Sequence, residues 1–321
     1  MGGIDILIKK QVPIVGKSFV KVFGMVHALV FVLSVFATGC ASKPNETSQK
    51  GTGDSTQAAI NETKKDPYDF NIPQEDKNMY KISRFLHKIA GDKLEEFAAR
   101  WTNEYGTAFK KLTTSNPGLI RYSQNYRVIA ANSPIESSAT GGYDVIDEIW
   151  FENKAAADAL FSSKEYQETL LPIQAKYIDT KQSVVITGNA HITQKNPIAP
   201  KEDKGKVIYQ SARKPDLSFE EFKYHWLYIH APLTRKVPGT ENLVMRAEFM
   251  PTERVSYTGL QPADFDGEGA IWFNSFKDMQ AIFTSDYYIK TLAPDEKKFT
   301  DPSRTRVQPV NEVVIFTSSK W

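Results

Sequence analysis

The sequence has a single cysteine, Cys40, among its 321 residues. One cysteine excludes a disulfide framework within the chain. Neither charge sign is in large excess, because 40 Lys and Arg stand against 38 Asp and Glu. The chain therefore has no broad field that would attract nucleic acid or an acidic macromolecule, and we expect no nucleic-acid partner.

Motifs for phosphate and metal binding are also scarce. Gly51-x-Gly53 has neither a predicted strand before it nor a predicted helix after it, so it is no nucleotide-binding loop. His225 and His230 are five residues apart, about 140° around an α-helix, and should not face one metal ion. We expect no metal site.

The N-terminal 40 residues carry an export pattern. Four lysines precede the apolar run 28–36, which ends in Ala37-Thr38-Gly39-Cys40. A charged segment, a short apolar run and small residues before a break are typical of a secretory signal. The end resembles the lipobox of bacterial lipoproteins, in which the cysteine is lipidated and becomes the mature N-terminus.

We therefore predict a signal peptide over residues 1–39 and lipidation of Cys40, with an uncleaved signal anchor as the alternative. The protein should lie in the bacterial cell envelope, anchored to a membrane by lipid. Residues 40–77 are rich in Ser, Thr, Gln, Asn, Gly and Lys and have no apolar period, so they are predicted to form a flexible tether.

The rest of the chain is hydrophobic enough for a sizeable core, and it repeats itself. The segment Leu94-Glu95-Glu96-Phe97-Ala98-Ala99-Arg100-Trp101 recurs 125 residues later as Phe219-Glu220-Glu221-Phe222-Lys223-Tyr224-His225-Trp226. Further matches are Arg121 with Arg246, Ile149-Trp150-Phe151 with Ile271-Trp272-Phe273, and Val184-Val185-Ile186 with Val313-Val314-Ile315. The period exceeds the roughly 20–50 residues of a solenoid unit, so each copy is a small domain. We predict copy 1 over residues 78–192, a linker over 193–204 and copy 2 over 205–321.

Each copy predicts the element order βαββαβ, a ferredoxin-like unit. In copy 1 we expect strands at 80–86, 119–128, 145–151 and 183–187, and helices at 94–112, capped by Asp92 with Glu95, and at 154–170, stopped by Pro172. In copy 2 we expect strands at 206–210, 243–249, 270–273 and 312–316, and helices from 219, capped by Ser218 with Glu221, and at 276–290.

Helices cover one face of such a sheet, so the other face must be buried against a partner. The second copy supplies that partner. The predicted fold class is therefore α+β, with two ferredoxin-like βαββαβ units packed as an intramolecular dimeric α/β barrel, an internal pseudo-dimer. The carboxylates Asp147, Glu148 and Glu268 are expected to face solvent.

The segment from Lys206 to Phe222, followed by Trp226 and His230-Ala231-Pro232-Leu233, resembles the EthD family of dimeric α/β barrels. The resemblance covers both copies. It implies chemistry on small organic molecules, either oxidative degradation or the dehydration, decarboxylation or cyclisation of polyketide-like aromatic intermediates without a bound cofactor. In copy 1 Trp101 is kept, but Tyr105 stands where the histidine falls, so a site that needs the imidazole is single.

His230 is the predicted catalytic acid or base, because an imidazole titrates near neutral pH. It lies four residues after Trp226, so both side chains should project from one helix face, and Ala231-Pro232 should end or kink the helix. We expect Tyr209 and Arg246 to join them in one cavity of copy 2. Two alternatives stay open: His230 only bonds a carbonyl at the helix end, or it holds haem, as histidines do in some dimeric α/β barrels.

The further candidate ligand contacts are Trp101 and Tyr105, at the equivalent place in copy 1. Arg121 and Arg246 could bind a carboxylate or enolate from inside the barrel. Two functions follow. One is a cofactor-independent enzyme, an isomerase, lyase or oxidoreductase, that acts on a small aromatic or polyketide-like molecule. The other is a ligand-binding or scaffold lipoprotein without turnover.

Overall fold

The computed structural model describes residues 79–128, 142–196 and 204–321. The predicted signal peptide, Cys40 and the tether lie outside the described residues. Within the described part of the chain, no helix is both long enough and apolar enough to cross a membrane.

Copy 1 has the predicted βαββαβ order, and its helices contain π-helical segments, labelled η. Its elements are β1 (Met79–Leu86), α2 (Leu94–Arg100), η2 (Trp101–Gly106), α3 (Thr107–Lys111), β2 (Leu119–Arg127), β3 (Val145–Phe151), α4 (Lys154–Ser162), η4 (Tyr166–Leu170), α5 (Leu171–Tyr177) and β4 (Val184–Lys195).

Copy 2 repeats the order with two short additions, α8 and β7. Its elements are β5 (Gly205–Ser211), α6 (Phe219–Tyr224), η5 (His225–His230), α7 (Ala231–Thr234), α8 (Thr240–Leu243), β6 (Val244–Pro251), β7 (Gln261–Pro262), β8 (Gly267–Phe273), α9 (Phe276–Phe283), η6 (Tyr288–Leu292), α10 (Ala293–Phe299) and β9 (Arg306–Thr317).

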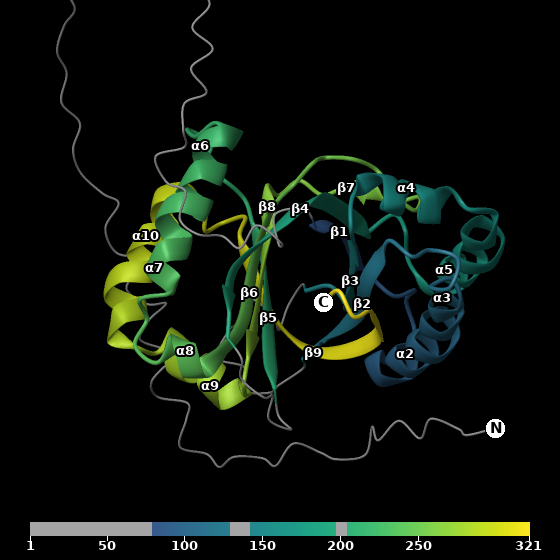
Figure 1. Ribbon diagram of the computed structural model, residues 1–321, viewed down its shortest axis with the longest axis horizontal. Helices are drawn as coiled ribbons and strands as arrows, with labels where there is room; N and C mark the ends of the chain where they lie inside the picture. The colour runs from purple at the N-terminus through teal and green to yellow at the C-terminus, as the bar shows by residue number, and fades with distance from the viewer. Residues whose placement is uncertain (1–78, 129–141, 197–203) are drawn as a thin grey trace, which may run out of the picture. The chain divides into compact units, whose positions relative to one another are not determined.

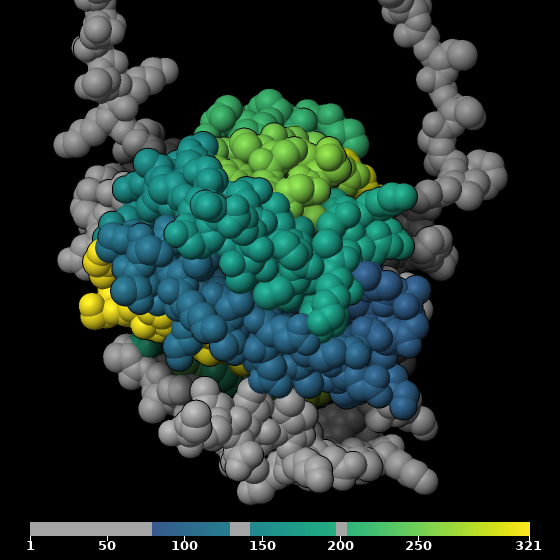
Figure 2. All heavy atoms as spheres, turned by 90° about the vertical axis from the view of Figure 1, so that its right-hand side faces the viewer, coloured from purple at the N-terminus to yellow at the C-terminus, as the bar shows by residue number. Residues whose placement is uncertain are grey.

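The strands close into one barrel. The sheet order is β1-β3-β2-β9-β5-β8-β6-β4-β7, and pairing of β1 with β4 closes a ring of eight strands that leaves β7 outside. The two copies join at the antiparallel ladders β2–β9 and β4–β6. In Figure 1 the helices of copy 2, α6 to α10, lie on one side of the barrel and those of copy 1 on the other. Figure 2 shows the copy 1 side, where its blue and teal segments cover the barrel. The predicted fold class is confirmed.

The strand registers correct one of the sequence matches. Lys81 pairs with Gly188 in copy 1, and its counterpart Lys206 pairs with Val310 in copy 2. The last strands therefore correspond at a spacing of 122 residues, so matching Val184 with Val313 was wrong. The segment 193–195, predicted as linker, belongs to β4, because the strand continues to pair with β6 of copy 2.

Three local predictions for helix ends meet different outcomes. The capping box of Ser218 and Glu221 is confirmed at the start of α6. Asp92 is not a cap; the N-cap residue of α2 is Lys93, whose side chain makes no capping bond, and Asp92 binds Arg100. Pro172 does not stop its helix. It is the second residue of α5, directly after the π-helical segment η4, whose wider turn changes the i→i+4 hydrogen bonds that a proline would break.

Side chains alternate between the barrel lumen and the helix layers, as the period of a strand requires. The lumen side is apolar over much of its area, with Phe85, Trp150 and Trp272 in one buried cluster. Against the sequence prediction, Asp147, Glu148 and Glu268 are all buried rather than exposed.

Charged side chains fill the middle of the lumen and bind across the two copies. Lys81 Nζ of copy 1 lies 2.6 Å from Glu148 Oε1, 2.6 Å from Glu268 Oε1 and 3.2 Å from Glu248 Oε2. Lys206 of copy 2 binds Glu148 and lies 3.1 Å from Glu312 Oε1. The lumen is therefore a packed core with ion pairs, as buried charges need partners.

Candidate functional site

A cavity of about 90 Å³ lies outside the barrel, between the sheet of copy 2 and its helices. Strands β5, β6, β8 and β9 supply one wall, and η5, α9, η6 and α10 supply the other. Most of the lining is aromatic or aliphatic. The polar and titratable groups that converge on it include His230, Glu296, Tyr209 and Tyr288.

His230 and Trp226 both reach this cavity from the π-helical segment η5, and Tyr209 reaches it from β5. The helix does not end at Ala231-Pro232 but continues to Thr234 as α7. Proline has no N–H and crowds the carbonyl four residues before it, so it normally ends an α-helix. Here the preceding π-helical turn replaces the i→i+4 hydrogen bonds with i→i+5 bonds, which lets the helix continue.

Asp295 orients the His230 ring. Its Oδ2 lies 3.1 Å from His230 Nδ1, and both of its oxygens lie 3.2 Å from His225 Nε2. The carboxylate is 2% exposed. Burial alone raises its pKa, but hydrogen bonds from His230, Lys298 and His225 outweigh burial and hold the pKa well below its usual range. An ionised Asp295 thus accepts a hydrogen bond from Nδ1–H of His230. The other ring nitrogen, Nε2, is then the one without a proton in the neutral ring.

Glu296 faces that second nitrogen. His230 Nε2 and Glu296 Oε1 are 4.0 Å apart, and Tyr288 Oη donates to Glu296 Oε2 at 3.3 Å. Burial raises the pKa of the Glu296 carboxyl, although the nearby His230 lowers it. Burial also keeps the hydroxyls of Tyr209 and Tyr288 neutral, because it raises their pKa well above 10. The cavity therefore combines an imidazole nitrogen with a buried carboxyl whose pKa is raised.

Small residues in copy 2 make room for the cavity. In the strand registers Ala247 takes the place of Tyr122, and Gly269 the place of Asp147. The Trp226 indole lies against the glycine backbone of β8, and a Cβ at Gly267 would come within 2.2 Å of Trp226 Cζ3. Bulkier residues at these strand positions would displace the indole that walls the cavity.

The equivalent space of copy 1 is filled. Trp101 and Tyr105 stack at 4.0 Å between ring centroids and have no exposed surface. Arg84 donates to Tyr105 Oη at 2.7 Å and forms an ion pair with Asp147, which also accepts from Trp101 Nε1 at 3.3 Å. This corrects the prediction that Trp101 and Tyr105 line a ligand pocket, because their polar atoms are already bound within the core.

Arg246 is not in the cavity with His230. It lies in the lumen, where its Nη2 is 2.6 Å from Glu248 Oε1 and its guanidinium lies over the Trp321 ring at 3.7 Å. Arg121, its counterpart, lies 3.0 Å from Glu312 and 4.5 Å from the same ring. Both arginines point inside the barrel as predicted, but glutamates of the chain itself bind them.

The sequence analysis missed Asp295, Glu296 and Tyr288. The repeat contained a usable signal. A spacing of 122 residues matches Pro172 of copy 1 with Pro294 of copy 2. At that spacing, Asp295 and Glu296 stand in the places of Ile173 and Gln174. The acidic pair thus occurs in the copy that has the histidine.

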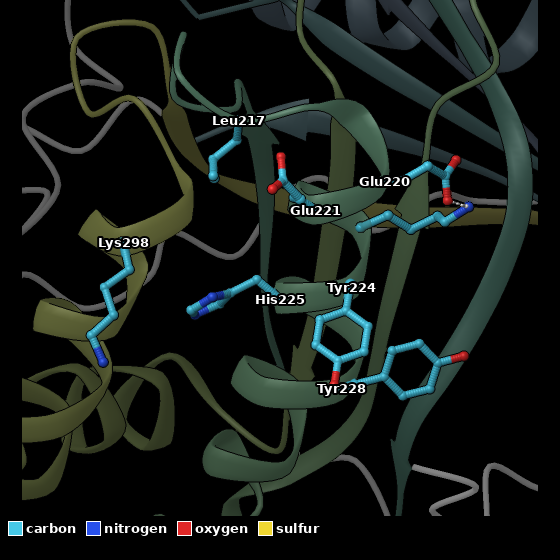
Figure 3. A pocket seen from close by; sticks show the side chains of 8 residues that line it. Leu217, Glu220, Glu221, Tyr224, His225, Tyr228 and Lys298 are labelled. Carbon is cyan, nitrogen blue, oxygen red and sulfur yellow. Dashed lines mark ion pairs between the residues drawn. The ribbon is translucent and has the colours of Figure 1, made fainter. Parts of the chain in front are cut away.

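A wider depression of about 630 Å³ lies on the other side of η5. Figure 3 shows His225 projecting from η5 toward the helix that carries Lys298, with Tyr224 and Tyr228 beside it. His225 is 17% exposed at its side chain and stacks on Phe299 at 4.8 Å. Asp295 therefore separates a histidine at the outer surface from one at the inner cavity.

The described part of the chain has no group of three or more His, Cys, Asp or Glu side chains arranged to hold a metal ion. The His230 cavity is also far smaller than a haem macrocycle. The residues present do not fit haem at His230.

The sequence matches the EthD domain twice, over residues 91–181 and 214–303, which together make up more than half of the chain. The chain belongs to the EthD family. Both EthD matches lie within the predicted copies, and the family prediction is confirmed. The comparison with curated proteins gives no match.

Several solved structures are similar to this EthD protein at low sequence identity. A protein from Fusobacterium nucleatum subsp. nucleatum, provisionally assigned as a monooxygenase, aligns with a TM-score of 0.51 and 8% identity over 74% of this chain and 93% of its own. An anthrone oxidase-like protein aligns at 0.49 and 10% over 76% and 98%. An EthD family protein from Bacillus halodurans aligns at 0.28 and 21% over 34% of this chain and 99% of its own.

Proposed function

We propose that the copy 2 cavity is the active site of a cofactor-independent enzyme, with His230 as its general acid or base. The observation that carries the proposal is the alignment of Asp295, His230 and Glu296 at an aromatic cavity. A carboxylate that orients an imidazole, whose other nitrogen faces a ligand space, is the arrangement that general-base catalysis requires. The substrate class is a small aromatic or polyketide-like molecule, because aromatic and aliphatic side chains make up most of the walls and the volume is small.

The chemistry that fits the two groups is enolisation. His230 Nε2 takes a proton from a carbon next to a carbonyl, and the carboxyl form of Glu296 gives its proton to the carbonyl oxygen. Return of a proton from His230 at a different carbon, with recovery of one by Glu296, completes an isomerisation. Loss of a neighbouring hydroxyl as water would instead give a lyase reaction. Attack of the enolate on dioxygen as co-reactant would make the protein an oxidoreductase.

Hydrogen–deuterium exchange tests the proposal without knowledge of the product. Single-ring aromatic ketones with an acidic C–H are incubated with the protein in D₂O, and loss of that C–H signal is followed by NMR. We expect the wild type to accelerate exchange and His230→Gln to slow it by roughly 10²–10⁴-fold, the usual effect of a positioned acid or base.

Tyr105→Phe is the matched control, because Tyr105 holds the equivalent position in copy 1 but binds Arg84 in a filled core. It should leave exchange within about twofold of wild type. Equal effects of the two substitutions would mean that the copies work alike. If no ketone exchanges faster with wild type than with His230→Gln, the protein is not this enzyme.

The second candidate is a ligand-binding lipoprotein without turnover. The packed lumen and the filled copy 1 core support it, because neither of these described parts of the chain offers the kind of space that the copy 2 cavity has. A ketone that binds with the same affinity to wild type and His230→Gln, and exchanges with neither, would favour this candidate.

We also propose that Cys40 carries a lipid that anchors the protein to a membrane of the bacterial envelope. Small residues before a single cysteine, after an apolar run, support it. Cys40→Ser should leave an unprocessed precursor and abolish metabolic labelling with palmitate, since the thiol is the acceptor. Equal labelling of the variant and the wild type would refute the anchor.

A further inference from the structure

Two histidines share one buried carboxylate across the wall between the outer depression and the inner cavity. His225 lines the depression, His230 lines the cavity, and both rings lie within 3.2 Å of Asp295. In an α-helix, residues five apart point in different directions. The π-helical turn of η5 bonds residue i to residue i+5, which brings the two rings to the same side of the helix.

The other groups around Asp295 are few. Lys298 Nζ lies 3.1 Å from Asp295 Oδ1, but its side chain is 66% exposed, so water screens its charge. Glu296 is the next residue on α10 and faces His230 Nε2. His225 is the better-ordered partner, because its ring is packed on Phe299 and reaches both carboxylate oxygens.

We infer that His225 is a positioning residue for His230: its Nε2–H holds the Asp295 carboxylate from the solvent side, which fixes Nδ1–H of His230 on Asp295 and Nε2 toward the cavity. The inference rests on the proposed function, since it concerns how the base of that site is oriented.

The charge of the His225 ring affects this arrangement. Burial lowers the pKa of His225, although Asp295 opposes this effect, so His225 is the neutral donor at neutral pH. Protonation of His225 from the depression at lower pH would reduce the support that Asp295 gives to His230.

Imidazole ¹⁵N NMR of the uniformly ¹⁵N-histidine-labelled protein tests the inference. In the wild type we expect His230 to be roughly nine-tenths or more the Nδ1–H tautomer, because that nitrogen has the carboxylate partner.

His225→Phe keeps the ring packed on Phe299 and removes the N–H. We expect His230 to become a mixture of tautomers. His225→Gln keeps an N–H donor, so it should retain the single tautomer. Lys298→Met is the control at the same carboxylate and should retain the wild-type tautomer.

The wild-type tautomer in His225→Phe would overturn the inference, and so would a tautomer mixture in His225→Gln together with the same mixture in Lys298→Met. The ketone exchange rate separates this result from the proposed function. If His225→Phe shifts the His230 tautomer while His230→Gln leaves exchange unchanged, the positioning holds and the enzyme proposal fails. If His230→Gln abolishes exchange and His225→Phe changes neither the tautomer nor the rate, the enzyme proposal holds and the positioning inference fails.

Discussion

Glu268 shows how a single lumen residue makes stability depend on pH. Its carboxylate is 1% exposed and binds Lys81. Burial raises its pKa to about 7, although Lys81 opposes the effect. The folded chain therefore binds a proton that the unfolded chain releases above the ordinary value of 4.5, and the free energy of unfolding falls as pH rises between these two values.

Glu268→Gln should remove this loss of stability with rising pH. Between pH 5 and pH 8 we expect the variant to gain on the order of 2–3 kcal/mol of stability relative to wild type, since each pH unit between the two pKa values contributes ~1.4 kcal/mol. Urea unfolding at several pH values measures the difference.

Glu248→Gln is the matched control for Glu268→Gln. Burial raises the pKa of Glu248, but Lys81 and Arg246 outweigh it and lower the pKa to about 2. Ionisation of Glu248 stabilises the fold fully above the pKa of the unfolded chain, and this stabilisation is lost only at more acidic pH. The difference in the free energy of unfolding between Glu248→Gln and wild type should therefore stay constant from pH 5 to pH 8. A constant difference for Glu268→Gln as well would contradict the prediction.

Sequence reasoning placed three of the four predicted cavity residues together, because Trp226 and His230 are four apart on a helix that follows the strand of Tyr209. It failed for Arg246. In the β6–β8 register Arg246 lies opposite Trp272, and both point into the lumen. Strand alternation decides this side, and it depends on an irregularity in the register between Val244 and Arg246 that hydrophobic patterning does not reveal.

At the scale of elements, the helices were predicted by their apolar period, but their π-helical turns were not. The separation of His225 and His230 by about 140° assumes α-helical geometry. In η5 the i→i+5 pattern brings both rings to Asp295. Helical periodicity cannot predict this, because one wide turn changes the direction of later side chains while leaving the composition the same.

The capping box of α6 is the element-scale feature that is easiest to test. Ser218 Oγ accepts from Glu221 N–H at 3.2 Å, and the Glu221 carboxylate accepts from Ser218 N–H at 2.8 Å. Ser218→Ala should lower the free energy of unfolding by about 1 kcal/mol, whereas Ser218→Asp should keep most of it. Urea unfolding measures both, and equal stability of Ser218→Ala and wild type would show that the cap contributes nothing.

At the scale of the whole molecule, the barrel was predictable because the repeat supplied two equal sheets, each with one face to bury. The seams were less predictable. Both β4 and β9 are 12 residues long and continue past their own sheets to pair with the other copy. The second half of β4 looks like a short polar segment after a strand, so sequence reasoning assigned residues 193–195 to a linker.

Closure within one chain predicts a monomer. The sheet edges that would pair with a second protein are already used at β2–β9 and β4–β6. In light scattering, a chain that starts at residue 78 should have the mass of a single chain at all concentrations measured. An obligate dimer would show that other surfaces bury a further interface.

The lumen charges have a consequence for which halves can pair. With every carboxylate counted as ionised, copy 1 brings one more cation than carboxylates, and copy 2 brings one more carboxylate than cations. The copy 1 residues are Lys81, Arg121 and Glu148, and the copy 2 residues are Lys206, Arg246, Glu248, Glu268 and Glu312. Two copies of the first half would enclose an excess of two positive charges, and two copies of the second an excess of two negative charges, each costly without water. In this count the mixed pair is neutral, so the lumen charges favour pairing of the two unlike halves over a symmetric dimer of either half.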